Sequence, residues 1–247
     1  MSTRPSLAAL VAVSCLSCAH SRPQPEVKSL EETHPAAADL IPAVARSVEA
    51  ARQFIIEKNL VTVPSEVRVK VEATPPYARA GSFASMDTPG PFETHATEAF
   101  YYVTPVEADW DAKHQEEHLR LYNPWTVGMI NVHEAYPGHY LEFLYAPRFP
   151  TKTRKRVHSS TNSEGWAHYS EQMAVEHGFG NGDPRMKLAQ LQEALLRDCR
   201  YGKLEIQELA RDCLAAKHAT LKEFHNAFVV QGALPIPLVR KILLGMP

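Results

Sequence analysis

The chain has 247 residues, of which 45% are hydrophobic and 22% charged, and its formal net charge is −2. This length and composition are ordinary for one globular domain, with or without appendages, that buries a hydrophobic core. Because the chain is close to neutral and has no long basic run, nucleic-acid binding has no electrostatic support. The twelve histidines mildly favour metal chemistry.

The first residues resemble a bacterial export signal. Arg4 supplies a positive start, and Leu7 to Leu16 form an apolar stretch that is too short to span a bilayer. The following sequence, Leu16-Ser17-Cys18-Ala19, resembles a lipoprotein cleavage box in which Cys18 would receive the lipid.

This pattern divides the chain into three parts. We expect residues 1–20 to form a signal peptide, residues 21–37 a polar tether and residues 38–247 a single domain. The expectation is an exported lipoprotein of the periplasm or cell envelope, which touches the membrane only through its lipid anchor. The alternative is a cytoplasmic protein with a disordered N-terminus.

Hydrophobic periodicity and turn residues predict a mainly helical domain. The expected helices cover residues 39–58, 111–122, 124–136, 163–176, 184–199, 203–217, 221–231 and 238–244. Alternating or aromatic stretches predict strands at 67–72 and 99–104, a loop over 80–97 and a basic connector at 145–162. The expected fold class is therefore α+β, mainly α with a small antiparallel β element.

The sequence His133-Glu134-Ala135-Tyr136-Pro137-Gly138-His139 places two imidazoles and a carboxylate within seven residues. On a straight helix, position i+6 lies about 240° around the axis, on the wrong face for a shared metal. Proline disrupts a helix and glycine permits unusual backbone angles, so Pro137-Gly138 can return His139 toward His133. Glu134 would then act as a general base on metal-activated water. The alternative is a helix end where His139 only satisfies carbonyl groups.

A second polar cluster contains Glu164, His168 and Glu171 at the spacing i, i+4, i+7. This spacing places the three side chains on one helix face. Glu164 would complete a His/His/Glu zinc site that keeps one position open for water. Glu171 or His168 could orient a ligand imidazole from behind. A solvated helix surface is the alternative interpretation.

Two further groups of metal-competent residues are interpreted more simply. His114 and His118 match the inverted zincin pattern H-x-x-E-H, but their segment is charged on nearly every side, which favours a solvated helix face. Cys199 and Cys213 are compatible with a disulfide formed after export or with two buried thiols.

The two central clusters resemble a known family. The sequences His-Glu-Ala-Tyr-Pro-Gly-His-Tyr, at 133–140, and Glu-Gly-Trp-Ala-His-Tyr-Ser-Glu, at 164–171, are similar to those of the bacterial domain of unknown function 885. That family is mostly helical and is similar to zinc-dependent peptidases of the gluzincin type. Shorter stretches such as 100–105 and 115–119 share the likeness, which covers roughly residues 40–245.

The resemblance implies a zincin-like fold, Zn²⁺ as cofactor and a peptide as substrate. It implies that His133, His139 and Glu164 bind the metal and that Glu134 is the general base. It also implies that the region 67–104 includes an edge strand against which a peptide could lie.

The chain departs from the family in length, because members are about twice as long. In the family, a helical stretch with His, Arg and Tyr residues separates the segments that correspond to 195–200 and 201–204. Such residues are natural candidates for binding a substrate carboxylate and an oxyanion. Their absence weakens the expectation of turnover more than that of metal binding.

The sequence leaves several side chains as candidates for stabilising the oxyanion: Tyr140, Tyr169, His168 and Tyr201. The expected function is that of a zinc hydrolase acting on peptide bonds. One alternative is an exported remnant that binds metal or peptide without catalysis. Another is a helical interaction module whose histidine cluster is purely structural.

Overall fold

The computed structural model describes residues 27–93, 95, 97–196, 200–217 and 219–246. The helices are α1 (Leu40–Glu57), α2 (Ala112–Leu121), α3 (Pro124–Glu134), α4 (His139–Tyr145), α5 (Lys152–Arg156), α6 (Ser160–Glu176), α7 (Pro184–Leu196), α8 (Arg200–Lys217), α9 (Leu221–Val229) and α10 (Ile236–Leu244). The strands are β1 (Lys70–Ala73), β2 (Ala84–Asp87) and β3 (Phe100–Val103). The predicted signal peptide, Cys18, Cys199 and the first part of the tether lie outside the described residues.

All eight predicted helices are present, with ends that differ by a few residues. Their starts follow the local chemistry of the chain. The Thr220 hydroxyl accepts a hydrogen bond from the backbone N–H of Glu223, whose carboxylate accepts one from the backbone N–H of Thr220. This capping box opens α9 as the sequence indicated. Asp183 caps α7 in a similar way, because its carboxylate accepts the backbone N–H of Arg185.

Two helices were not predicted. Helix α4 begins at His139, in a stretch for which the sequence predicted neither a helix nor a strand, and it buries Leu141 and Tyr145. Helix α5 lies within the basic connector, where the Thr151 hydroxyl caps it by accepting the backbone N–H of Arg154. Both helices are short, so their periodicity is too brief to distinguish them from loops in sequence.

The small sheet is mixed, with strand order β1-β3-β2. The two strands that the sequence predicted, β1 and β3, pair in parallel, and the antiparallel pair of the sheet is β2 with β3. Strand β2 lies inside the stretch that we expected to be a loop. Its sequence Ala-Ser-Met-Asp contains no β-branched or aromatic residue, so propensity does not reveal it. Strand β3, the last in the chain, lies in the middle of the sheet, between β1 and β2. Both β1 and β2 are therefore edge strands.

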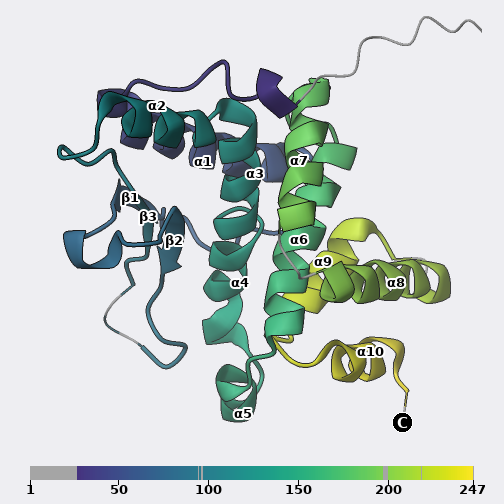
Figure 1. The fold of residues 1–247 in the computed structure, drawn as a ribbon. Helices are drawn as coiled ribbons and strands as arrows, with labels where there is room; N and C mark the ends of the chain where they lie inside the picture. Colours follow the sequence, from purple (N-terminus) through teal and green to yellow (C-terminus); the bar gives the residue numbers. More distant parts are fainter. Residues whose placement is uncertain (1–26, 94, 96, 197–199, 218, 247) are drawn as a thin grey trace, which may run out of the picture.

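Helices α3 and α4 form a central column, with the sheet on one side and α6, α8, α9 and α10 on the other (Figure 1). Helix α3 packs against α1, α6 and α7, which explains why its residues from Trp125 to His133 are buried. A histidine at the end of such a helix needs a polar partner. Among the described residues, no helix has both the length and the apolar character needed to cross a membrane.

Helix α6 lies directly against α8 at a glycine contact. A Cβ atom on Gly202 would lie 1.9 Å from the carbonyl oxygen of Thr161, and one on Gly165 would lie 2.6 Å from the carbonyl carbon of Gly202. Glycine at both positions therefore lets the two backbones touch. This contact fixes the position of α6, which carries the second polar cluster.

The turn between α3 and α4 returns the chain toward the end of α3. The Tyr136–Pro137 peptide bond is cis, and the backbone N–H of Gly138 donates to the carbonyl of Val132 over 2.9 Å. A Cβ atom on Gly138 would lie 1.6 Å from the carbonyl oxygen of His133, so only glycine fits there. As a result, the rings of His133 and His139 are 4.9 Å apart between centroids.

We expect Gly138→Ala to lower the free energy of unfolding by more than about 3 kcal/mol, because the added methyl group can fit only if the turn opens. Urea denaturation followed by circular dichroism would measure the change. Gly90→Ala is a matched control, since a Cβ atom there meets nothing within 4 Å. A loss for Gly138→Ala no larger than that of the control would show that the turn does not depend on glycine.

Candidate metal centre

Three side chains from three helices converge at the centre of the fold. His133 lies in the last turn of α3, His139 is the first residue of α4, and Glu164 lies on α6. The Nε2 atom of His133 is 3.4 Å from Oε2 of Glu164, and the Nε2 atom of His139 is 3.6 Å from Oε1. All three ligand atoms lie within 4.8 Å of one another. Ligands about 2.1 Å from a tetrahedral zinc ion are separated by about 3.4 Å, so these spacings suit one ion.

Glu171 holds His133 from behind. Its Oε1 atom lies 2.7 Å from Nδ1 of His133, and the two side chains are 0% and 1% exposed. Because a carboxylate only accepts, Nδ1 of His133 is the donor in this contact, and the Nε2 atom of the ring is directed toward Glu164. This is how proteins commonly orient a metal-binding imidazole.

The other oxygen of Glu171 lies 3.3 Å from Nδ1 of His168, which is also buried. Burial alone would raise the pKa of Glu171, but the hydrogen bonds from His133 and His168 outweigh it and lower that pKa. The carboxyl group is therefore ionised at neutral pH. The structure thus brings both predicted supporting residues, His168 and Glu171, next to His133.

His133, His168 and Glu171 form a second group whose ligand atoms lie within 4.8 Å of one another. All three of its residues are buried, whereas His139 and Glu164 in the first group are partly exposed. A catalytic metal needs an open position that water and substrate can reach. The first group therefore suits a catalytic metal, and the second suits the support of His133.

Two residues that the sequence did not indicate, Ser163 and Glu142, support the His139 ring through hydrogen bonds. Its Nδ1 atom lies 3.4 Å from the hydroxyl of Ser163, which in turn donates to Oε2 of Glu142 over 3.1 Å. Burial, opposed by the Ser163 hydrogen bond and aided by the charge of Glu164, raises the pKa of Glu142 to about 7. Glu142 lies about one helical turn after His139. This spacing is common on helix surfaces, so it does not identify Glu142 as a supporting residue in sequence.

A cleft of about 460 Å³ opens onto His139 and Glu164. Its walls come from the end of β2 and the residues after it, from α4, and from α5 with the segment that follows it. The basic residues that line it are Arg154, Lys155 and His158. The sequence indicated only a basic connector at 145–162, and the structure makes part of it one wall of the cleft.

Glu134, the expected general base, is the last residue of α3 and is partly exposed beside the buried His133. Its position at the helix end leaves its side chain at the margin between the buried core and solvent. The sequence prediction of its role is compatible with this placement.

Two of the predicted oxyanion candidates, Tyr140 and Tyr169, have hydrogen-bond partners of their own. The Tyr140 hydroxyl donates to the carbonyl of Val67 over 3.2 Å. The Tyr169 hydroxyl lies 2.9 Å from Nε2 of His225, whose Nδ1 donates to the carbonyl of Leu60 over 2.6 Å. Because burial lowers the pKa of His225 to about 4, this imidazole is neutral and accepts from Tyr169. Both hydroxyls are therefore already engaged in hydrogen bonds with other groups.

Tyr201 is 69% exposed and lines a different surface hollow, on α8. Among the four candidates, His168 is the one whose ring adjoins that of a predicted ligand, with 5.1 Å between its centroid and that of His133. The oxyanion assignment to Tyr140, Tyr169 or Tyr201 thus gains no support from the structure.

The histidines of the H-x-x-E-H sequence make contacts of the kind found in a protein core or surface rather than in a metal site. His114 stacks on Trp110 at 4.0 Å, and Nε2 of His118 donates to the carbonyl of Thr104 over 2.9 Å. The His118 contact connects α2 to the residue that follows β3, and the His114 contact is local to the start of α2. Cys213 is buried, and its predicted partner Cys199 lies outside the described residues, so their pairing stays a prediction.

Comparison with solved structures gives two similar folds. A "putative lipoprotein of unknown function" from Shewanella oneidensis has a TM-score of 0.73 and 24% identity, over 91% of this chain and 50% of its own length. A "putative lipoprotein" from Colwellia psychrerythraea has a TM-score of 0.69 and 19% identity, over 87% of this chain and 45% of its own length. This chain thus spans about half the length of these two proteins.

None of the curated proteins matches the chain. The profile of a bacterial protein family of unknown function, DUF885, matches residues 17–201. This range includes the three ligand candidates and the residues that support His133 and His139. The expected family resemblance is thereby confirmed, and the chain belongs to the bacterial protein family of unknown function DUF885.

Proposed function

We propose that this chain is a zinc-dependent hydrolase that cleaves peptide bonds. One observation carries the proposal: two imidazole nitrogens and a carboxylate from three different helices converge within 4.8 Å at a partly exposed position. Two nitrogen ligands and one oxygen ligand suit zinc, whereas magnesium and calcium prefer oxygen ligands alone. The zinc ion would supply Lewis acidity and would lower the pKa of water in the open position.

The residues of the chain would divide the work as follows. His133, His139 and Glu164 hold the ion, and Glu171 and Ser163 fix the two imidazoles from behind. The Glu134 carboxylate accepts a proton from the attacking water and passes it to the nitrogen of the leaving amine.

The cleft provides a place for an extended peptide. Strand β2 is an edge strand, so its outer backbone groups have no neighbouring strand within the sheet. Met86 on β2 and Thr88 just after it line the same cleft as His139 and Glu164. A peptide that pairs with this edge would cross the metal centre, and this pairing would depend on main-chain hydrogen bonds.

We further propose that the protein is exported and lipidated at Cys18. The support is the cleavage-box sequence together with the two similar folds, each described as a "putative lipoprotein". In bacteria that express the full chain, radioactive palmitate should label the parent protein and should not label Cys18→Ser. Equal labelling of both proteins would overturn the proposal.

The function proposal predicts different effects for a ligand and for the base. His133→Ala should bind less than about half an equivalent of zinc, because one of three protein ligands is lost. Glu134→Gln should keep its zinc and lower kcat/KM for peptides by a factor of about 10² to 10⁴. Metal analysis of purified protein and cleavage of a peptide library would measure the two effects.

Two outcomes would contradict this proposal. Zinc content below half an equivalent in the parent protein, and undiminished by His133→Ala, would favour a structural histidine cluster. Full zinc content without Glu134-dependent cleavage of any peptide would favour a remnant that binds metal without catalysis.

Glu171 should matter for zinc affinity although it does not touch the ion. Glu171→Ala removes the acceptor for Nδ1 of His133, so we expect zinc affinity to fall by about 10- to 100-fold. Glu171→Gln should lose less, because its amide oxygen can still accept from Nδ1. Competition with a zinc chelator would measure the affinities. Glu176→Ala, at an exposed position of the same helix, is the control, and an equal loss there would refute the orienting role.

A further inference from the structure

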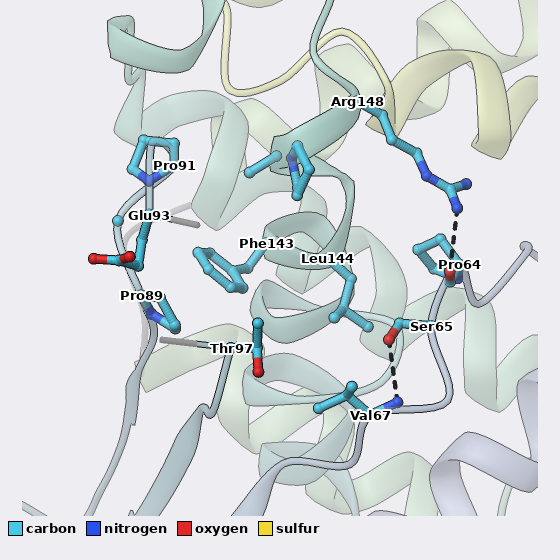
Figure 2. Close-up of a pocket in the computed structure, with 13 residues that line it drawn as sticks. Pro64, Ser65, Val67, Pro89, Pro91, Glu93, Thr97, Phe143, Leu144 and Arg148 are labelled. Carbon is cyan, nitrogen blue, oxygen red and sulfur yellow. Dashed lines mark hydrogen bonds between the residues drawn. The ribbon is translucent and has the colours of Figure 1, made fainter. Parts of the chain in front are cut away.

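We infer that an apolar pocket beside the metal centre binds one large hydrophobic side chain of the peptide substrate. The inference rests on the proposed function, because it names the substrate class of that site. The pocket has a volume of about 300 Å³ and is lined by α4 and by the segments before β1 and after β2, which lie on opposite sides of it (Figure 2).

The interior of this pocket is mainly apolar, and the hydroxyl groups of Ser65 and Thr97 also border it. Figure 2 shows the side chains of Val67, Pro89, Phe143 and Leu144 around the hollow, with Pro64 at its edge. An apolar surface of this kind favours an aliphatic or aromatic side chain, because a polar one would lose its hydrogen bonds to water on entry.

The charged residues of the pocket are held at its rim. The Arg148 guanidinium donates to the carbonyl of Pro64 over 3.1 Å and lies 5.8 Å from the centre of the Tyr145 ring. The Glu93 carboxylate accepts the backbone N–H of His95 over 2.7 Å. Figure 2 shows Arg148 and Glu93 on opposite sides of the hollow. Neither charge is therefore placed to compensate a polar side chain deep in the pocket.

The pocket adjoins the metal cleft. Pro91, Phe143 and Ala146 line both. Phe143 lies four residues after His139 on α4, so the two side chains share a helix face and are neighbours about 6 Å apart at Cβ. Successive residues of an extended peptide advance by about 3.3 Å. A side chain in the pocket would therefore belong to a residue within about two positions of the scissile bond.

The residues after β2 that line the pocket include Pro89, Pro91 and Thr97. Phe92, next to Pro91, has its ring centre 5.8 Å from the cationic groups of both Lys155 and Arg156 on α5. These cation–π contacts connect this side of the pocket to the helix that borders the metal cleft.

Short alanine peptides that carry a single Leu, Phe, Ser or Asp test the inference. With the zinc-loaded Glu134→Gln full chain, which should bind peptides without cleaving them, fluorescence anisotropy gives Kd for each peptide. At one position of the peptide, we expect Leu and Phe to bind about 10- to 100-fold more tightly than Ser or Asp.

Thr97→Phe, at an exposed position whose side chain faces the hollow, should fill the pocket and reduce this preference to less than about threefold. Leu144→Ser should reduce it from the opposite wall. Thr33→Phe, at an exposed position outside the pocket, is the matched control and should keep the full preference. Circular dichroism would establish that each variant is folded.

The outcomes separate this inference from the proposed function. If the parent protein cleaves peptides with no apolar preference, or with one that folded Thr97→Phe leaves intact, the pocket assignment is overturned and the hydrolase proposal stands. If the apolar preference in binding is present and lost in Thr97→Phe, but the parent protein cleaves none of the peptides, the pocket is supported and the hydrolase proposal fails.

Discussion

The buried hydrogen bond between Glu171 and His133 is the interaction on which the rest of the centre depends. A carboxylate and an imidazole inside the core are costly unless they satisfy each other. At 2.7 Å, with both side chains almost fully buried, the pair fixes the tautomer and the orientation of His133. It thereby decides that Nε2 faces Glu164. The position of Glu171 depends in turn on α6, whose close approach to α8 requires glycine at positions 165 and 202.

The turn at Gly138 adds the second constraint, because it makes α4 start beside the end of α3. One short helix then has two uses. Its first residue, His139, is one of the three ligand candidates, and Phe143 one turn later borders both the metal cleft and the apolar pocket. The proposed metal binding and the inferred selection of substrate would in this way be built on the same helix. A change in the turn would therefore move the ligand and the pocket together.

The sequence was sufficient for the parts of the fold that repeat a strong pattern. The long helices follow from periodicity and capping residues, and the two polar clusters follow from the spacing of their side chains. Strand β2 and helices α4 and α5 were not predicted, because each is short and depends on contacts with the rest of the fold. The supporting roles of Ser163 and Glu142 escaped for a similar reason, since their contact with His139 exists only after α4 and α6 meet. The parallel pairing of β1 with β3 was also missed, because β2, which lies between them in the chain, was not predicted.

His225 shows what a structural histidine looks like in this protein, and the comparison favours the metal interpretation of the centre. Its two ring nitrogens contact two neutral groups, the Leu60 carbonyl and the Tyr169 hydroxyl, and the ring is buried and neutral. At the centre, by contrast, the Nε2 atoms of His133 and His139 approach different oxygens of one partly exposed carboxylate, Glu164. Packing does not require three ligand atoms to gather at the mouth of a cleft, because the ring of His225 is satisfied without such an arrangement. The proposed cation would account for the convergence, for the support from Glu171 and for the open side that faces the cleft.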